Sequence, residues 1–267
     1  MERIYGKMWA YAGVSVVNAI PCWLGSTMAI DIKVKANFVK DNNNETSLIK
    51  TIKMFFENNY GIHDLVISII SPIPMQSGLK SSSAVAVAVI EAIKHKYGLN
   101  LSTPELAAKL CKEAGVSITG AFDDAVACYS GGISFTDNRR MKVFSVCELK
   151  DEFSIVLLMR GGRSFIDVSK LKNYAHLFEK IFSLAWRGDI IQAMKLNGIS
   201  VAKILGYETS IIRKALELGA LAAGISGNGP SIFALLKQGD EGPVYELFSK
   251  HGSALITSPA RVSRPLI

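Results

Sequence analysis

The chain has 267 residues, of which 49% are hydrophobic and 20% are charged. This is the composition of an ordinary globular protein, with enough sequence for one large domain or two small ones. The net charge of +7 would suit an anionic partner, but the basic residues are scattered, and their densest cluster, at 139–142, is too short for a nucleic-acid-binding arm. No stretch reaches the roughly 18 apolar residues that a membrane span requires.

The four cysteines indicate neither a disulfide framework nor a metal site. Cys22, Cys111, Cys128 and Cys147 show no Cys-x-x-Cys spacing and have no histidine partners at ligand intervals. We therefore expect a reduced, cytoplasmic protein.

The first part of the chain predicts two strands and a helix. Residues 10–19 form an apolar strand with a bend at Gly13, and residues 25–35 form a second strand. After a polar loop, the apolar residues of 47–58 recur at helical spacing until Gly61.

The central stretch reads Pro-Met-Gln-Ser-Gly-Leu-Lys-Ser-Ser-Ser-Ala over 74–84. The short β-branched run before it, 65–70, predicts a buried strand, and the run after it predicts a helix that ends at Gly98. A glycine- and serine-rich loop thus leads into a helix N-terminus, where unpaired N–H groups and the helix dipole favour a phosphate. Lys80 adds a positive charge. The plainer alternative is a serine cap on an ordinary helix.

A further helix is predicted from 103 to Gly115, with Thr103 as its cap and Pro104 in the first helical position. A loop then leads to Asp123 and Asp124, and strands follow at 131–136 and 142–147. The charged segment 148–152 marks the predicted domain boundary, which gives domains 1–150 and 151–267.

The second half predicts a strand at 153–159, helices at 168–187, 190–205 and 209–218, a glycine-rich turn at 224–231, a strand at 232–236, a helix at 242–251 and two short final strands. Because helices and strands alternate irregularly, an α+β fold is favoured over a doubly wound sheet.

Three motifs resemble those of the GHMP superfamily of small-molecule kinases. The central one is Pro74 followed by Gly-Leu-Lys-Ser-Ser-Ser-Ala at 78–84, the third is Ser-Gly-Asn-Gly-Pro-Ser at 226–231, and the first, at 12–19, is weaker. The segments Gly-Ala-Phe-Asp-Asp-Ala at 120–125 and Val-Val-Asn-Ala at 16–19 are most similar to the archaeal type of shikimate kinase.

This resemblance implies an α+β GHMP kinase fold, with a left-handed βαβ crossover in the N-terminal domain and a ferredoxin-like C-terminal domain. It also implies phosphorylation of shikimate by ATP with Mg²⁺. Asp123 would be the catalytic base, and Asp124 would point elsewhere or assist orientation. The resemblance assigns Ser82 and Glu113 to Mg²⁺. It assigns Pro74, Ser77, Gly78, Leu79, Lys80, Ser81, Ser82, Ser83 and Ala84 to ATP, and Asn18, Arg163, Gly227, Asn228 and Gly229 to the acceptor.

Several alternatives stay open at this level. The two aspartates could form a turn or helix cap, and Glu113 could be a solvated helix residue. Mevalonate kinases carry a lysine where this chain has Val14, so Lys7 or Lys80 could supply that charge, and Lys80 could equally line the phosphates. Homoserine kinase, a mevalonate-type kinase and a non-catalytic nucleotide-binding module are the competing functions, and monomer and homodimer are both possible.

Overall fold

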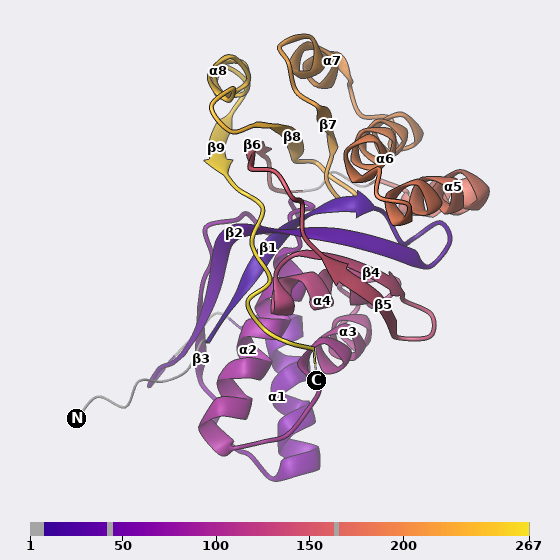
Figure 1. Cartoon of the computed structure of the whole chain (residues 1–267). Coiled ribbons are helices and arrows are strands. Elements are labelled where there is room, and N and C mark those ends of the chain that lie inside the picture. Colours follow the sequence, from indigo (N-terminus) through magenta and orange to yellow (C-terminus); the bar gives the residue numbers. More distant parts are fainter. Residues whose placement is uncertain (1–7, 42–44, 163–165, 267) are drawn as a thin grey trace.

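The computed structural model describes residues 8–41, 45–162 and 166–266 and folds them around two antiparallel sheets (Figure 1). The first sheet is built on one long strand, β2. The strands of this sheet are β1 (Trp9–Val17), β2 (Leu24–Phe38), β3 (Ile67–Ile70), β4 (Ile133–Asp137) and β5 (Lys142–Cys147). β1 pairs along one side of β2, both β4 and β3 pair along the other side, and β5 pairs with β4.

Four helices cover one face of this sheet, below it in Figure 1. They are α1 (Ser47–Tyr60), α2 (Ser81–Tyr97), α3 (Thr103–Glu113) and α4 (Phe122–Ser130). The alanines and valines of α2 are largely buried, and α2 packs on both β1 and β2. Such small side chains let the helix lie close to the sheet and hold its N-terminus at a fixed position. Gly98 ends α2 with a left-handed φ of 65°, as the sequence predicted.

The second sheet has the strand order β7-β8-β6-β9. Its elements are β6 (Phe153–Met159), the 3₁₀ helix η1 (Val168–Tyr174), α5 (Ala175–Trp186), α6 (Ile190–Leu205), α7 (Ser210–Glu217), β7 (Ala222–Ile225), β8 (Ile232–Lys237), α8 (Gly242–Ser249) and β9 (Ser253–Thr257). A βαββαβ order with this strand arrangement is ferredoxin-like. The expected ferredoxin-like C-terminal unit is therefore present.

The two units are interlocked. Helix α6 packs against both β7 and β1. After β9 the chain returns to the first sheet, where the Ala260 N–H donates to the Ala29 carbonyl at 2.9 Å. There the guanidinium of Arg264 donates to the Trp9 carbonyl at 2.7 Å. The division into domains 1–150 and 151–267 stays a prediction, and the tail crosses it.

Several local predictions need correction. The strand before the central loop is shorter than predicted and lies at the sheet edge: β3 pairs only with β2, and Ile70 is 56% exposed. Helix α3 begins at Thr103, so the cap position is Ser102, whose side chain makes no capping hydrogen bond, and the Thr103 hydroxyl instead bonds the Glu91 carboxylate. The helix predicted at 168–187 is divided into η1 and α5.

Two further corrections concern the last sheet. Gly224 belongs to a strand, β7, that was not predicted, so the glycine-rich turn begins later than expected. Only one of the two predicted final strands forms, and beyond it the described chain makes an isolated bridge from Pro259 to Ile30.

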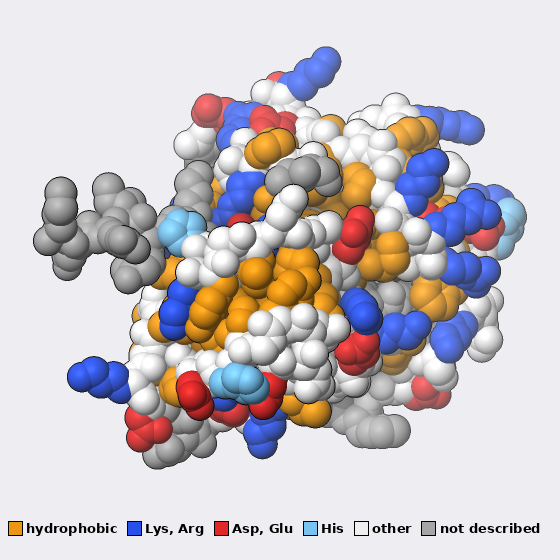
Figure 2. Space-filling view, turned by 90° about the horizontal axis from the view of Figure 1, so that it is seen from below, with side chains coloured by type: hydrophobic (Ala, Val, Ile, Leu, Met, Phe, Trp, Pro, Cys, Tyr) orange, Lys and Arg blue, Asp and Glu red, His pale blue; other side chains and the backbone are white. Residues whose placement is uncertain are grey.

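No helix in the described ranges is long and apolar enough to span a membrane. Seen from below, the molecule shows lysines and arginines interspersed with acidic side chains around a central apolar group (Figure 2). On this face the basic residues form no continuous patch, which agrees with the scattered charge of the sequence.

Candidate active site

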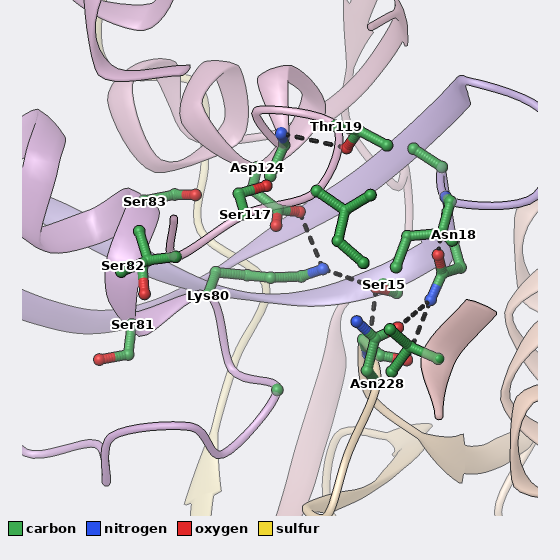
Figure 3. Close-up of a pocket in the computed structure, with 18 of the residues that line it drawn as sticks. Ser15, Asn18, Lys80, Ser81, Ser82, Ser83, Ser117, Thr119, Asp124 and Asn228 are labelled. Atoms are coloured by element: carbon green, nitrogen blue, oxygen red, sulfur yellow. Dashed lines mark hydrogen bonds and ion pairs between the residues drawn. The ribbon is translucent and has the colours of Figure 1, made fainter. Parts of the chain in front are cut away.

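A cavity of about 560 Å³ lies at the N-terminus of α2, between the first sheet, α4 and the turn after β7 (Figure 3). A cavity of this size is typical of small-molecule sites. Its lining comprises Ser15, Asn18, Ala19, Ile20, 76–78, 80–83, 115–119, Ala121, Asp123, Asp124, Ile166, Val168, Gly227 and Asn228.

The loop before α2 is anchored by the first and third motifs. The Gly13 N–H donates to the Leu79 carbonyl at 3.2 Å, and the Ser226 hydroxyl donates to the Gly78 carbonyl at 2.8 Å. Gly78 has a φ of +83°, and a Cβ there would lie 2.1 Å from the Ser226 carbonyl oxygen. Only glycine fits this position. The two hydrogen bonds and this close approach bring the three motifs together at the loop.

The N-terminus of α2 differs from an ordinary serine cap. The cap residue is Lys80, in a left-handed conformation with φ 67°, and its side chain makes no capping hydrogen bond. Ser81 and Ser82 are half-buried, line the cavity, and their hydroxyls bond no described residue. The backbone N–H groups of the first helical turn therefore remain available to an anion at the positive end of the dipole.

Asp123 and Asp124 stand in the first turn of α4. Asp123 is 3% exposed, and its carboxylate accepts from the Asn138 amide at 2.7 Å. The carboxylate also packs against β2, where a Cβ on Gly25 would lie 2.5 Å from its Cγ. Burial, followed by the charge of Asp124, raises the pKa of Asp123 to about 7, although Lys80 and hydrogen bonds from Asn138 and Thr27 act in the opposite direction.

Asp124 lines the cavity and is paired with Lys80. Of the two expectations for Asp124, that it points elsewhere or that it assists orientation, its place in the lining excludes the first, and the second stays a prediction. The Lys80 Nζ lies 2.8 Å from Asp124 Oδ1 and donates to the Ser15 hydroxyl at 2.6 Å. Burial on its own lowers the pKa of Lys80, but the charges of Asp124 and Asp123 outweigh burial, so the pKa is raised and the lysine is charged.

The third motif forms the opposite wall. The Gly227 N–H donates to the Ser15 hydroxyl at 3.1 Å, and the Asn18 amide donates to the Gly227 carbonyl at 3.2 Å and to Asn228 Oδ1 at 2.8 Å. Asn18 is also bonded by the backbone N–H of Ile20. Both amide protons of Asn18 thus bond the turn, and Asn228 lines the cavity beside it.

The structure brings most predicted site residues to the cavity. Those that line it are Asn18, Ser77, Gly78, Lys80, Ser81, Ser82, Ser83, Asp123, Gly227 and Asn228, and those that do not are Pro74, Leu79, Ala84 and Gly229. Gly229 instead packs against the Tyr207 ring. Glu113 is exposed on α3 and outside the lining, with its carboxylate 3.9 Å from Lys109 Nζ. Arg163 lies outside the described residues.

Sequence reasoning missed two parts of the cavity. Ser15 was seen only as a strand residue, although its place in the first motif could have indicated the site. The loop at 115–119 forms another wall, with Val116 40% and Ile118 45% exposed. The position of this loop just before Asp123 in the sequence could have indicated that it contributes to the cavity.

The donor set fits a magnesium ion only in part. No group of three or more His, Cys, Asp or Glu side chains that could hold a metal exists among the described residues. Ser82 and Asp124 nevertheless bring oxygen donors to the same cavity. Mg²⁺ commonly binds through one or two protein oxygens together with substrate phosphates, so the residues present are compatible with a nucleotide-bound Mg²⁺.

Family comparisons agree with this geometry. The model described as the GHMP kinases N-terminal domain matches residues 47–132, and that described as the GHMP kinases C-terminal domain matches 177–254. The chain belongs to the GHMP kinases, enzymes that use ATP as phosphate donor. A shikimate kinase from Pyrococcus furiosus is 33% identical, over 92% of this chain and 96% of the relative. One from Methanobrevibacter smithii is 35% identical, over 91% and 92%.

Solved structures show the same fold. A mevalonate kinase from Methanococcus jannaschii matches with a TM-score of 0.73 at 16% identity, over 95% of this chain and 97% of that one. A homoserine kinase from Cytophaga hutchinsonii matches with a TM-score of 0.67 at 17% identity, over 98% of each chain. These likenesses establish the GHMP kinase fold.

Proposed function

We propose that this protein is a shikimate kinase, which transfers the γ-phosphoryl group of ATP to the 3-hydroxyl of shikimate. The observation that carries the proposal is that one cavity is lined both by a helix N-terminus suited to an anion and by two neighbouring aspartates, Asp123, which is buried, and Asp124, which is partly exposed. The relatives that are 31–35% identical over most of the chain are shikimate kinases, which supports this choice of acceptor.

The phosphates would lie at the N-terminus of α2, against the backbone N–H groups and the hydroxyls of Ser81 and Ser82. An aspartate of the 123–124 pair would take the proton from the acceptor hydroxyl, as phosphoryl transfer requires an oriented nucleophile. A bound Mg²⁺ would neutralise charge on the phosphates, with Ser82 as its ligand in the cavity. Glu113 as a second ligand stays a prediction.

The acceptor would lie between Asp124 and the Asn228 wall. Ile20, Ile166 and Val168 offer apolar contacts to a carbocyclic ring. Lys80 is the only lysine or arginine among the described lining residues, and its charge is matched by Asp124. The acceptor carboxylate therefore needs another cation, and Arg163 remains the predicted one. A cytoplasmic location is part of the same proposal.

The direct test is phosphorus NMR of a reaction with ATP, Mg²⁺ and shikimate. We expect a new phosphomonoester signal coupled to the proton at carbon 3, with stoichiometric ADP. Chelation of the metal should stop the reaction, and added Mg²⁺ should restore it. ADP with inorganic phosphate alone, or no ATP consumption by a protein that binds ATP, would contradict the proposal.

A further inference from the structure

Ser15 is a buried polar residue of β1 that faces the cavity. The residue is 1% exposed and belongs to the cavity lining. Its hydroxyl oxygen accepts a hydrogen bond from the Lys80 ammonium at 2.6 Å and another from the Gly227 N–H at 3.1 Å. The hydroxyl is therefore held by two separate elements, the start of α2 and the turn after β7 (Figure 3).

The capacity that this hydroxyl has left is that of a donor. A hydroxyl group can accept two hydrogen bonds and can donate one. Both acceptor positions of Ser15 are taken, so its proton occupies the one direction that remains. Among the residues that the structure describes, none accepts this proton. Because a buried donor without an acceptor is costly, the cavity is built to receive an oxygen atom of a ligand beside Ser15.

The position of Ser15 favours the phosphoryl acceptor over the nucleotide as that ligand. Figure 3 shows Ser81 and Ser82, where the phosphates would bind, near the backbone of Lys80. Ser15 lies at the other end of the Lys80 side chain, close to Asn228. The wall that contains Asn228 is the one against which the acceptor would lie.

Ser15 is also close to the aspartates that the reacting hydroxyl would face. One ammonium group joins them, because Lys80 Nζ lies 2.8 Å from Asp124 Oδ1 and 2.6 Å from the Ser15 hydroxyl oxygen. A hydrogen bond between two hydroxyl groups spans about 2.8 Å. A ligand hydroxyl that reaches the aspartates therefore brings the hydroxyl on the adjacent ring carbon within reach of Ser15.

We propose that Ser15 is a specificity-determining residue that donates a hydrogen bond to the acceptor hydroxyl next to the one that is phosphorylated. The inference rests on the proposed function, in which the 3-hydroxyl of shikimate reacts, so the neighbour is the 4-hydroxyl. The bond takes no part in the transfer of the proton or of the phosphoryl group. It fixes the ring so that the 3-hydroxyl faces the aspartates. A hydroxyl oxygen can accept this bond, and a methylene group cannot.

A substrate analogue tests the contact in the wild-type protein. With ATP and Mg²⁺, 4-deoxyshikimate should be phosphorylated with a kcat/KM at least about tenfold below that of shikimate, because the Ser15 donor is left unpaired. Equal kcat/KM values for the two compounds would overturn the proposal without any variant. No turnover of shikimate itself would overturn the proposed function, and this inference with it.

The variant Ser15→Ala isolates the hydroxyl. The wild-type preference for shikimate over 4-deoxyshikimate should fall to within about threefold, because the variant lacks the donor that distinguishes them. Any effect of the substitution on Lys80 or Gly227 acts on both compounds alike and cancels from this ratio. An unchanged preference would show that Ser15 has only a structural role and would overturn the proposal.

The KM for ATP distinguishes an acceptor contact from a phosphate contact. In Ser15→Ala it should stay within about threefold of the wild-type value. A rise of about tenfold or more, with the preference between the two acceptors unchanged, would assign the hydroxyl to the nucleotide and overturn the proposal.

Ser26→Ala is the matched control. Ser26 is buried in β2 outside the cavity lining, and its hydroxyl bonds no described residue. This variant should keep the wild-type kcat/KM on both acceptors.

Discussion

Asp123 is a carboxyl group whose charge state is set by its surroundings. Burial and the charge of Asp124 raise its pKa from an ordinary 3.8 to about 7. Between these values the folded protein binds a proton that the unfolded chain does not. This carboxyl group therefore contributes stability that is fully present below about pH 4 and is lost as the pH rises to about 7.

Asp123→Asn should remove this pH dependence. Relative to wild type, the variant should gain on the order of 3 kcal/mol in unfolding free energy between pH 4 and pH 8. Urea unfolding at several pH values measures the difference. Asp31→Asn, at an exposed aspartate of β2, is the matched control and should show no comparable change. A constant difference between Asp123→Asn and wild type would contradict the assigned pKa.

At the same scale, the sequence predicted the chemistry of the residues better than their contacts. The paired aspartates and Lys80 were both recognised, but their contact joins two helices, α2 and α4, whose relative placement no local pattern specifies. Lys80, one of the two lysines considered for this charge, extends over Gly13, where a Cβ would lie 3.1 Å from its Cγ, and contacts Asp124. Its role stays a prediction, and Lys7 lies outside the described residues.

The loop that leads into α2 depends on close backbone contact with the turn after β7. Gly78→Ala would place a Cβ 2.1 Å from the Ser226 carbonyl at a φ of +83°. We expect a loss of at least about 2 kcal/mol in unfolding free energy and at least about tenfold in ATP affinity. Calorimetry of unfolding and of nucleotide binding measures both.

Gly61→Ala is the control for this variant. Gly61 ends α1 at a φ of +61°, and a Cβ there would meet no atom within 4 Å. The substitution should cost about 1 kcal/mol of stability through backbone strain alone, with ATP affinity unchanged. Equal losses of ATP affinity in the two variants would show that ATP affinity does not depend on the contact between Gly78 and Ser226.

Helices and strands were predicted correctly where the local sequence signal was strong. The prediction failed where pairing with neighbouring strands determines the structure. The helix α2 has a long buried apolar run and a glycine stop, and it forms as predicted. The apolar run before the central loop predicts a buried strand, but β3 has a partner on one side only. Strand β7, which pairs with β8, is only four residues long and starts with two alanines, so its sequence carries little signal for a strand.

At the scale of the whole molecule, Asn18 joins the two units across the cavity. Its amide bonds both Gly227 and Asn228, and its backbone N–H donates to Asn197 Oδ1 at 2.9 Å. This arrangement fixes the third motif relative to the first sheet. The fold was predicted through motif resemblance, because periodicity alone indicates an α+β class but not this topology.

Asn18→Ala should therefore weaken the link between the units. We expect a loss of about 1–3 kcal/mol in unfolding free energy, because buried polar partners are left unpaired. A double-mutant cycle with Asn228→Ala should give a coupling of at least about 0.5 kcal/mol. Asn59→Ala, which removes an exposed bond on α1, should change stability little. Additive effects of Asn18 and Asn228 would contradict a direct link.

The central claim is that the protein phosphorylates shikimate in this cavity. A measurement of acceptor specificity tests the claim most directly. We would measure kcat/KM for shikimate, homoserine and mevalonate in parallel, with ATP and Mg²⁺, by coupled ADP release. The account predicts turnover on shikimate with a kcat/KM at least about 100-fold above the other two. Preferred turnover on homoserine or mevalonate would contradict the proposal of shikimate as the acceptor but would leave the kinase activity supported. No turnover on any of the three acceptors by protein that binds ATP would contradict the account as a whole.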